Sequence, residues 1–291
     1  MLIQQILNGI MLGSTYALIA ISFTLLMGIL NMLNFAIGEV FMLGAILGLT
    51  FVKLGFPFHL AFLLAIFCSG CASLVIERFS FRPLRHAPPL VPLLSTIGFS
   101  ILFQNIAENI WGSERSQFPQ WMEPIDFHVG PLLISSTQLL IFAAAVLLMI
   151  GLDVFIQRTR IGRAMRAVAE NIETASILGV DSNRIILTTF FVSGVLAGAS
   201  GILFGLSFYI VSPFMGMEPG IKGIAAMIVG GMGNLRGAIV GGMFIGIIEV
   251  LSVAYFGASA KDFAVYGALF VALIIRPQGI LGMIQSERER I

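Results

Sequence analysis

The sequence predicts an all-α protein, a polytopic bundle of transmembrane helices that forms one permease-like domain over residues 1–291. Hydrophobic residues make up 58% of the chain and charged residues only 11%, whereas a soluble domain carries roughly 25% charged residues. Several apolar runs approach or exceed the ~20 residues that a helix needs to cross a bilayer. The chain lacks the ~10-residue segments of alternating polarity that are typical of a transmembrane β-barrel.

Nine apolar segments follow one another along the chain, which predicts about eight or nine spans. The second and the seventh are short for a full crossing, so either of them could be re-entrant. The segments cover residues 5–28, 36–53, 58–77, 90–110, 134–156, 185–210, 219–235, 237–257 and 262–276.

Arginines predict the orientation of these segments, because basic residues favour cytoplasmic loops. If nine segments cross, the arginines of loop 78–85, those of loop 157–184, Arg236 and Arg276 all fall on one side, which is then cytoplasmic. The loop at about 111–133 is mainly acidic and is expected outside. The N-terminus is then external and the C-terminus cytoplasmic, although eight crossings would move one end.

Small residues recur at four-residue intervals within the apolar segments. Such stripes let helix backbones approach closely in lipid, where packing drives association. They predict tight helix contacts, and thin helix walls would also suit helices that slide during a transport cycle. The stripes comprise Gly9, Gly13 and Ala17; Gly44 and Gly48; Gly194, Gly198, Gly201 and Gly205; and Gly237, Gly241, Gly242 and Gly246.

Two polar breaks precede the two short segments. Asn31, Asn34 and Glu39 lie before or at the start of the second, and Glu218 and Lys222 lie at the start of the seventh. Paired interrupted segments indicate the pathway of a transporter. Ordinary interfacial loops would produce the same pattern.

Glu249 lies in the middle of an apolar span, where an unpaired carboxylate costs on the order of 2.5–3.5 kcal/mol. It must therefore face a cavity, form a pair or carry a proton. Thr96, in the fourth segment, is a further candidate for a polar pathway, although interhelical hydrogen bonding would explain it equally. The candidate pathway residues are therefore Asn31, Asn34, Glu39, Thr96 and Glu249.

The loop at about 157–184 carries the pattern of an amphipathic helix. Its apolar residues recur at spacings of three and four, and Gly179 follows where a left-handed residue would end the helix. Asp181 or Ser182 can cap the next span. Such a helix could lie on anionic lipid, cover the bundle or dock in a groove of another protein, and its acidic second half favours the last. The stripe is Ile161, Met165, Val168, Ile172, Ala175 and Leu178.

No motif in the chain predicts catalysis. A Walker A loop is excluded because no Gly-Lys pair occurs, and neither HExxH nor GxSxG is present. Cys68 and Cys71 lack further ligands nearby, so packing explains them better than a metal. We therefore expect a transport subunit that is no enzyme and holds no cofactor or metal. Nothing in the charge pattern indicates binding of nucleic acid.

Several stretches resemble the branched-chain amino acid permease family of ABC importers, and in particular its LivH-like subunit. "GRAMRAVAENIETASILGV" is similar to the cytoplasmic coupling segment of such permeases. The opening "NGIMLGSTYALIAISFTLLMGILNMLNFAIGEVFMLGA", the run "GIAAMIVGGMGNLRGAIVGGMFIGIIE" and the final "RPQGILG" also match, and similarity fails mainly near 111–133.

The resemblance implies a multi-pass protein of the bacterial cytoplasmic (inner) membrane with several partners. These are a second related permease, two ATPase subunits that bind ATP, and an extracytoplasmic solute-binding protein. It also implies that a coupling helix over 163–179 inserts into an ATPase cleft. The matching positions are Arg163, Arg166, Ala167, Glu170, Asn171, Ala175 and Gly179.

Two alternatives to branched-chain amino acid import stay open from the sequence. Permeases for urea and short-chain amides resemble the same family, and nothing in the spans indicates a leucine pocket. A channel or an ion-coupled carrier would instead use Glu39 or Glu249 as its titrating group.

Overall fold

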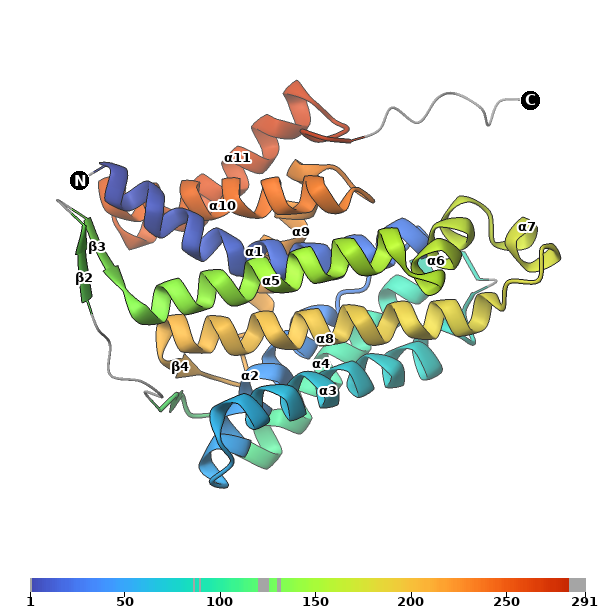
Figure 1. Ribbon diagram of the computed structural model, residues 1–291, viewed down its shortest axis with the longest axis horizontal. Helices are drawn as coiled ribbons and strands as arrows, with labels where there is room; N and C mark the ends of the chain where they lie inside the picture. Colours follow the sequence, from blue (N-terminus) through green and yellow to red (C-terminus); the bar gives the residue numbers. More distant parts are fainter. Residues whose placement is uncertain (1, 86, 89, 120–125, 130–131, 283–291) are drawn as a thin grey trace.

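The computed structural model describes residues 2–85, 87–88, 90–119, 126–129 and 132–282, and these form a helical bundle (Figure 1). The helices are α1 (Leu2–Leu30), α2 (Ile37–Lys53), α3 (Phe58–Ile76), α4 (Leu90–Trp111), α5 (Ser136–Arg158), α6 (Arg160–Glu170), α7 (Ile172–Ile177), α8 (Ser182–Phe208), α9 (Met217–Gly230), α10 (Leu235–Phe256) and α11 (Lys261–Ile275). A π-helical turn (Glu77–Phe81) continues α3, and a short 3₁₀ turn (Ala258–Ala260) precedes α11.

The nine predicted apolar segments correspond to the nine long helices, and most ends agree within three residues. In the described part of the chain, seven helical stretches are long and apolar enough to cross a membrane. The two remaining segments are the short ones, α2 and α9. The predicted segment 219–235 extends too far, because α9 ends at Gly230 and a turn with left-handed glycines at Gly231 and Gly233 precedes α10.

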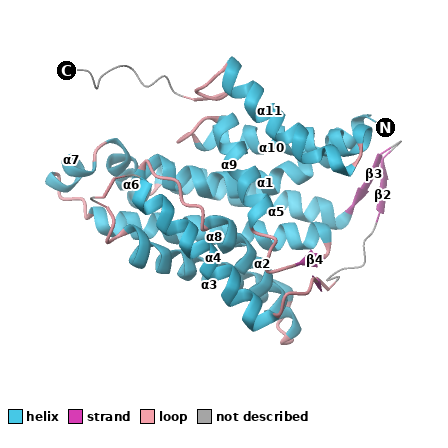
Figure 2. Ribbon diagram, turned by 180° about the vertical axis from the view of Figure 1, so that it is seen from behind, coloured by secondary structure: helices cyan, strands magenta, loops and turns pink. Residues whose placement is uncertain are grey.

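The two ends of the bundle carry different elements. Figure 1 shows the start of α1 and a β-hairpin at one end, and α6 and α7 at the other. Following the arginine distribution, we call the first the external end and the second the cytoplasmic end. The hairpin pairs β2 (Asp126–Val129) with β3 (Leu132–Ser135), and β1 (Ser116–Gln117) pairs with β4 (Ile210–Val211), both antiparallel. Figure 2 shows these strands confined to the external end.

Glycine stripes bring the central helices together, as predicted. A Cβ atom at Gly246 of α10 would lie 2.3 Å from the Cα of Gly13 in α1, and one at Gly44 of α2 would lie 2.4 Å from the Cα of Gly198 in α8. Side chains therefore cannot separate these backbones, and the helices pack through their small faces.

Serine hydroxyls add polar contacts between α1 and α8, the most buried of the seven span-length helices in the described chain. Ser193 Oγ donates to the Ser22 carbonyl at 2.9 Å, and Ser200 Oγ donates to the Thr15 carbonyl at 2.8 Å. In contrast, α4, α5 and α11 expose apolar side chains that suit contact with lipid or with another subunit. Examples are Leu94, Leu147, Ile150, Phe263 and Phe270.

The two short helices meet at their N-termini inside the bundle. A Cβ atom at Gly38 of α2 would lie 2.7 Å from the Gly216 carbonyl oxygen at the start of α9. The C-terminal end of α2 lies at the external end, because Lys53 lines a cavity together with Trp111, the residue at which α4 ends and the external loop begins. The end of α9 leads to Gly233, which shares a groove with Met165 of α6 at the cytoplasmic end. Each short helix therefore spans only part of the bundle, an arrangement that places irregular backbone at its centre.

Candidate functional site

The cytoplasmic loop forms two helices rather than the single helix predicted over 161–178. Asn171 has an extended backbone (φ −160°, ψ 115°) that breaks the helix between α6 and α7. Its side-chain oxygen accepts a hydrogen bond from the Thr174 backbone N–H at 2.8 Å and so caps α7. Asparagine favours such N-cap positions over helix interiors, which explains the break.

This break divides the apolar stripe between two surfaces. Met165 and Val168 of α6 and Ala175 of α7 are buried and pack in a small cluster with Ile185 of α8. Ile177 and Leu178, at the end of α7, are 85% and 77% exposed. The buried residues of the stripe therefore cover the bundle, whereas the end of α7 presents apolar side chains to the outside.

The end of α7 is built as the sequence predicted. Gly179 has a φ of +87°, in the left-handed region that favours glycine. The Val180 N–H donates to the Ala175 carbonyl at 3.0 Å and the Gly179 N–H donates to the Ser176 carbonyl at 3.1 Å, the pair of bonds that defines a Schellman motif. Asp181 then caps α8 by accepting from the Arg184 backbone N–H.

The other predicted coupling residues take different positions on α6. Arg163 and Glu170 are exposed, and Ala167 is half-buried. Arg166 turns back and donates a hydrogen bond to the Ile156 carbonyl near the end of α5. The segment is therefore fixed to the bundle through α6, and it projects through α7 at the far right of Figure 1.

A buried ion pair lies beside this segment at the cytoplasmic end of α3. Glu77, whose side chain is fully buried, pairs with Arg85 at 2.5 Å. Arg85 also donates to the side-chain oxygen of Asn183, in the first turn of α8. This bridge ties α3 to the point at which α7 leads into α8.

A second charge network contains Glu249 and extends from the buried Lys222 to partly exposed side chains. Its Oε1 atom accepts from Lys222 Nζ of α9 at 2.7 Å, and the Lys222 side chain is fully buried. Lys222 Nζ also lies 2.7 Å from Glu218 Oε1 and 3.3 Å from Asp262 Oδ1, while Lys261 Nζ lies 2.6 Å from Glu218 Oε1. Glu249 is thus paired, one of the three states that its position required.

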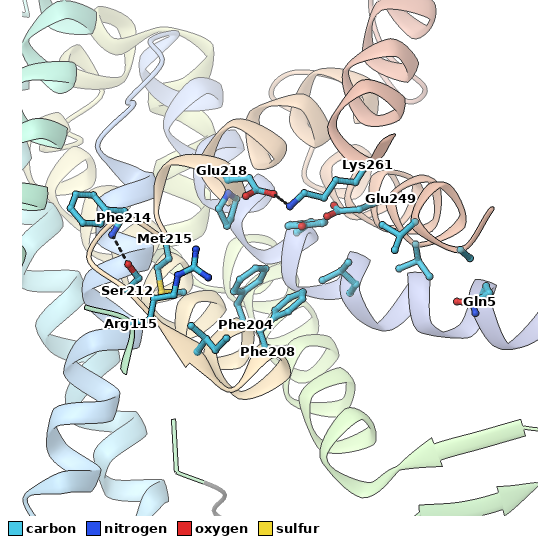
Figure 3. A pocket seen from close by; sticks show the side chains of 17 residues that line it. Gln5, Arg115, Phe204, Phe208, Ser212, Phe214, Met215, Glu218, Glu249 and Lys261 are labelled. Carbon is cyan, nitrogen blue, oxygen red and sulfur yellow. Dashed lines mark hydrogen bonds and ion pairs between the residues drawn. The ribbon is translucent and has the colours of Figure 1, made fainter. Parts of the chain in front are cut away.

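A cavity of about 600 Å³ lies beside this network and opens toward the external end. Its polar lining includes Glu218, Glu249 and Lys261, together with Arg115 from the external loop. Figure 3 shows the rings of Phe204 and Phe208 between the side chains of Arg115 and Glu249. The cavity therefore combines charges of both signs with an aromatic surface.

The other predicted pathway residues lie away from this cavity, near α4. Thr96 Oγ1 accepts from the Phe35 backbone N–H at 3.2 Å, and Ser100 Oγ donates to Glu39 Oε1 at 3.2 Å. Asn34 Oδ1 accepts from the Ala36 N–H at 3.1 Å. Asn31 ends α1 in a left-handed conformation (φ +53°). The structure thus brings Asn34, Glu39 and Thr96 to one side of α2 and leaves Glu249 in a different group.

Three features of the cavity escaped sequence analysis. Lys222 stood in a polar break, but nothing in the sequence paired it with Glu249, 27 positions further along. Arg115 reaches the cavity because β1 pairs with β4, a contact between segments almost 100 residues apart. Phe204 and Phe208 lie four residues apart on α8. This spacing predicts that they share one face of the helix, but it does not predict that this face lines a cavity.

Comparisons with known proteins identify the family. Residues 5–275 match the family described as "Branched-chain amino acid transport system / permease component". The chain is 39% identical to the high-affinity branched-chain amino acid transport system permease protein BraD of Pseudomonas aeruginosa, over 98% of this chain and 97% of that protein. It is 37% identical to the corresponding LivH permease of Escherichia coli, with the same coverage.

A solved structure supports the fold alone. An ABC transporter assigned to the metal-chelate type, in an inward-facing conformation, superposes with a TM-score of 0.52 at 17% identity and covers 94% of this chain and 85% of its own. The family match, the two near full-length relatives and the seven apolar helices lead to one conclusion. The chain belongs to the branched-chain amino acid permease family of ABC transporters and is a multi-pass protein of the cytoplasmic membrane.

Proposed function

We propose that this chain is a transmembrane subunit of an ATP-driven importer of branched-chain amino acids. Two ATPase subunits dock at the cytoplasmic end, a second related permease completes the membrane pathway, and a solute-binding protein delivers the amino acid from outside. The chain itself binds no ATP and forms part of the pathway through the membrane. Its membership of the permease family supports this role, as does its similarity to BraD and LivH, permease proteins of high-affinity branched-chain amino acid transport systems.

The exposed end of α7 is the observation that carries the coupling role. Ile177 and Leu178 lie there with little cover from the rest of the described chain, on a helix closed at both ends by Asn171 and Gly179. An exposed pair of large apolar side chains at a helix end suits insertion into a groove of a partner protein. Because α6 is packed on the bundle, a movement of α7 is transmitted to α5 and α8.

Copurification and uptake test this role together. Leu178→Asp places a charge on the docking surface, so the ATPase subunits are expected to dissociate and ATP-dependent leucine uptake by proteoliposomes to cease. Leu133→Asp is the matched control, because Leu133 is exposed on β3 at the external end. Unchanged ATPase binding and uptake in Leu178→Asp would refute docking at α7.

The driving force and the substrate are measured with the same proteoliposomes. Leucine uptake driven by a proton gradient without ATPase subunits would make the chain an ion-coupled carrier. ATP-dependent uptake of urea or a short-chain amide, but not of leucine, would assign it to that transport class instead.

A further inference from the structure

We propose that the external cavity is a transit site in which Glu249 binds the ammonium group of the transported amino acid and Arg115 binds its carboxylate. The inference rests on the proposed import function and adds to it the residues that hold the solute inside the permease.

The network beside the cavity carries one negative charge in excess. Lys222 and Lys261 supply two positive charges, and the carboxylates of Glu218, Glu249 and Asp262 supply three negative charges. The side chains of Glu218 and Asp262 are about half exposed, so water screens their charges, and Arg115 in the cavity lining supplies a third positive charge. Among the described residues, the cavity and its network therefore hold equal numbers of positive and negative groups, which suits a ligand that carries one charge of each sign.

Glu249 is the carboxylate that can receive the positive group of such a ligand. Its side chain is 9% exposed and lines the cavity. Lys222 binds Oε1, which holds the carboxylate in one orientation. The Tyr16 hydroxyl lies within hydrogen-bonding reach of the Glu249 carboxylate, and the described residues give the buried Oε2 atom no other donor. A carboxylate oxygen with so few donors retains the capacity to accept a hydrogen bond from a ligand.

Arg115 supplies the complementary charge on the other side of the cavity. The β1–β4 pairing, in which Ser116 lies opposite Val211, holds the loop residue at this position. The Arg115 side chain takes part in no ion pair with another described residue. Guanidinium groups bind carboxylates with paired hydrogen bonds, so an arginine at the mouth without an ion pair to a described residue suits the other end of a zwitterion.

The surface between the two charges is apolar. The rings of Phe204 and Phe208 lie 4.4 Å apart between their centroids, and Leu12, Val250 and Val253 complete the wall. The volume of about 600 Å³ falls within the range of roughly 300–1,000 Å³ that is typical of small-molecule sites. This apolar part of the wall suits an aliphatic side chain, whereas Glu218 and Lys261 lie elsewhere in the lining.

Equilibrium binding to the assembled transporter tests the site. The complex is reconstituted in nanodiscs without the solute-binding protein, and binding of radiolabelled leucine, 3-methylbutylamine and 4-methylpentanoate is measured. The amine lacks the carboxylate, and the acid lacks the ammonium group. Loss of a hydrogen bond to a charged group lowers affinity by about tenfold or more.

The two variants are expected to discriminate between the ligands. Glu249→Gln should raise the Kd for leucine and for the amine about tenfold or more and leave the Kd for the acid unchanged. Arg115→Gln should raise the Kd for leucine and for the acid by a similar factor and leave the Kd for the amine unchanged. Glu114→Gln, which removes a carboxylate from the same loop outside this cavity, should change none of them. If Glu249→Gln does not fold, Arg115→Gln decides, because its side chain lies on an exposed loop.

Failure of the site is distinguishable from failure of the proposed function. Unchanged leucine affinity in both folded variants, or no saturable leucine binding by the wild type, overturns the transit site while ATP-dependent leucine uptake still stands. An absence of ATP-dependent leucine uptake in the wild type overturns the function instead. A shift that is equal for all three ligands would show general damage to the cavity and refutes the assignment of the two charges.

Discussion

The contact between α2 and α8 provides a direct test of how closely the helices pack. A Cβ atom at Gly201 would lie 1.9 Å from the Phe41 carbonyl oxygen. A carbon and a carbonyl oxygen approach to about 3.3 Å, so Gly201→Ala must separate the two backbones by about 1.4 Å. Overpacking of this kind costs typically 1–3 kcal/mol, and alanine in a helix recovers about 0.5–1 kcal/mol relative to glycine. We expect a net loss of about 1–2 kcal/mol.

Gly151→Ala is the matched control, because no atom lies within 4 Å of a Cβ at that position in α5. Here only the helix propensity changes, so stability should stay the same or rise by about 0.5 kcal/mol. Thermal melting of both purified variants in one detergent, followed by intrinsic fluorescence, measures the difference. If Gly201→Ala melted at the same temperature as Gly151→Ala, the close approach of α2 and α8 would be wrong.

Three further substitutions test the buried charges and the loop helix. Lys222→Met leaves Glu249 uncompensated and should lower stability by about 3–5 kcal/mol. Adding Glu249→Gln should restore part of this loss. If the stability losses of the two single variants simply added in the double variant, the pairing would be wrong. Arg85→Ala should likewise destabilise the fold and expose the cytoplasmic end of α3 to proteolysis, and adding Glu77→Gln should partly restore resistance. Equal proteolysis of the single and the double variant would argue against this pair. Gly179→Val should reduce ATPase coupling because a β-branched residue is strained at φ +87°, whereas Gly179→Asn should retain it; equal coupling would show that the left-handed turn is dispensable.

Local features of the sequence determined the elements of this fold. Each long apolar segment became a helix, because a backbone in lipid must satisfy its own hydrogen bonds. The glycine stripes became the closest helix contacts, as at Gly44 and Gly198. Gly179 ends α7 as predicted, because few other residues adopt a left-handed conformation without strain. Such features depend on neighbours in sequence or on one residue type, so they are visible without the fold.

One local prediction was wrong for a local reason. The spacing of apolar residues from Ile161 to Leu178 fits a continuous helix, but Asn171 caps a second helix instead. Periodicity records which residues share a face and does not register a side chain that competes for backbone hydrogen bonds. The break matters because it leaves Met165 on the bundle and Leu178 exposed.

The tertiary structure alone decided which polar groups meet. The position of Glu249 in an apolar span required a partner, a cavity or a proton, and only the fold identified Lys222 as its partner. Arg115 reached the same cavity through a strand pairing that no local pattern marks. The sequence by itself thus determined the helices, their small faces and the need to compensate a buried charge, because these follow from the chemistry of single segments in lipid. The choice of partners depends on how distant segments pack, so it belongs to the tertiary structure.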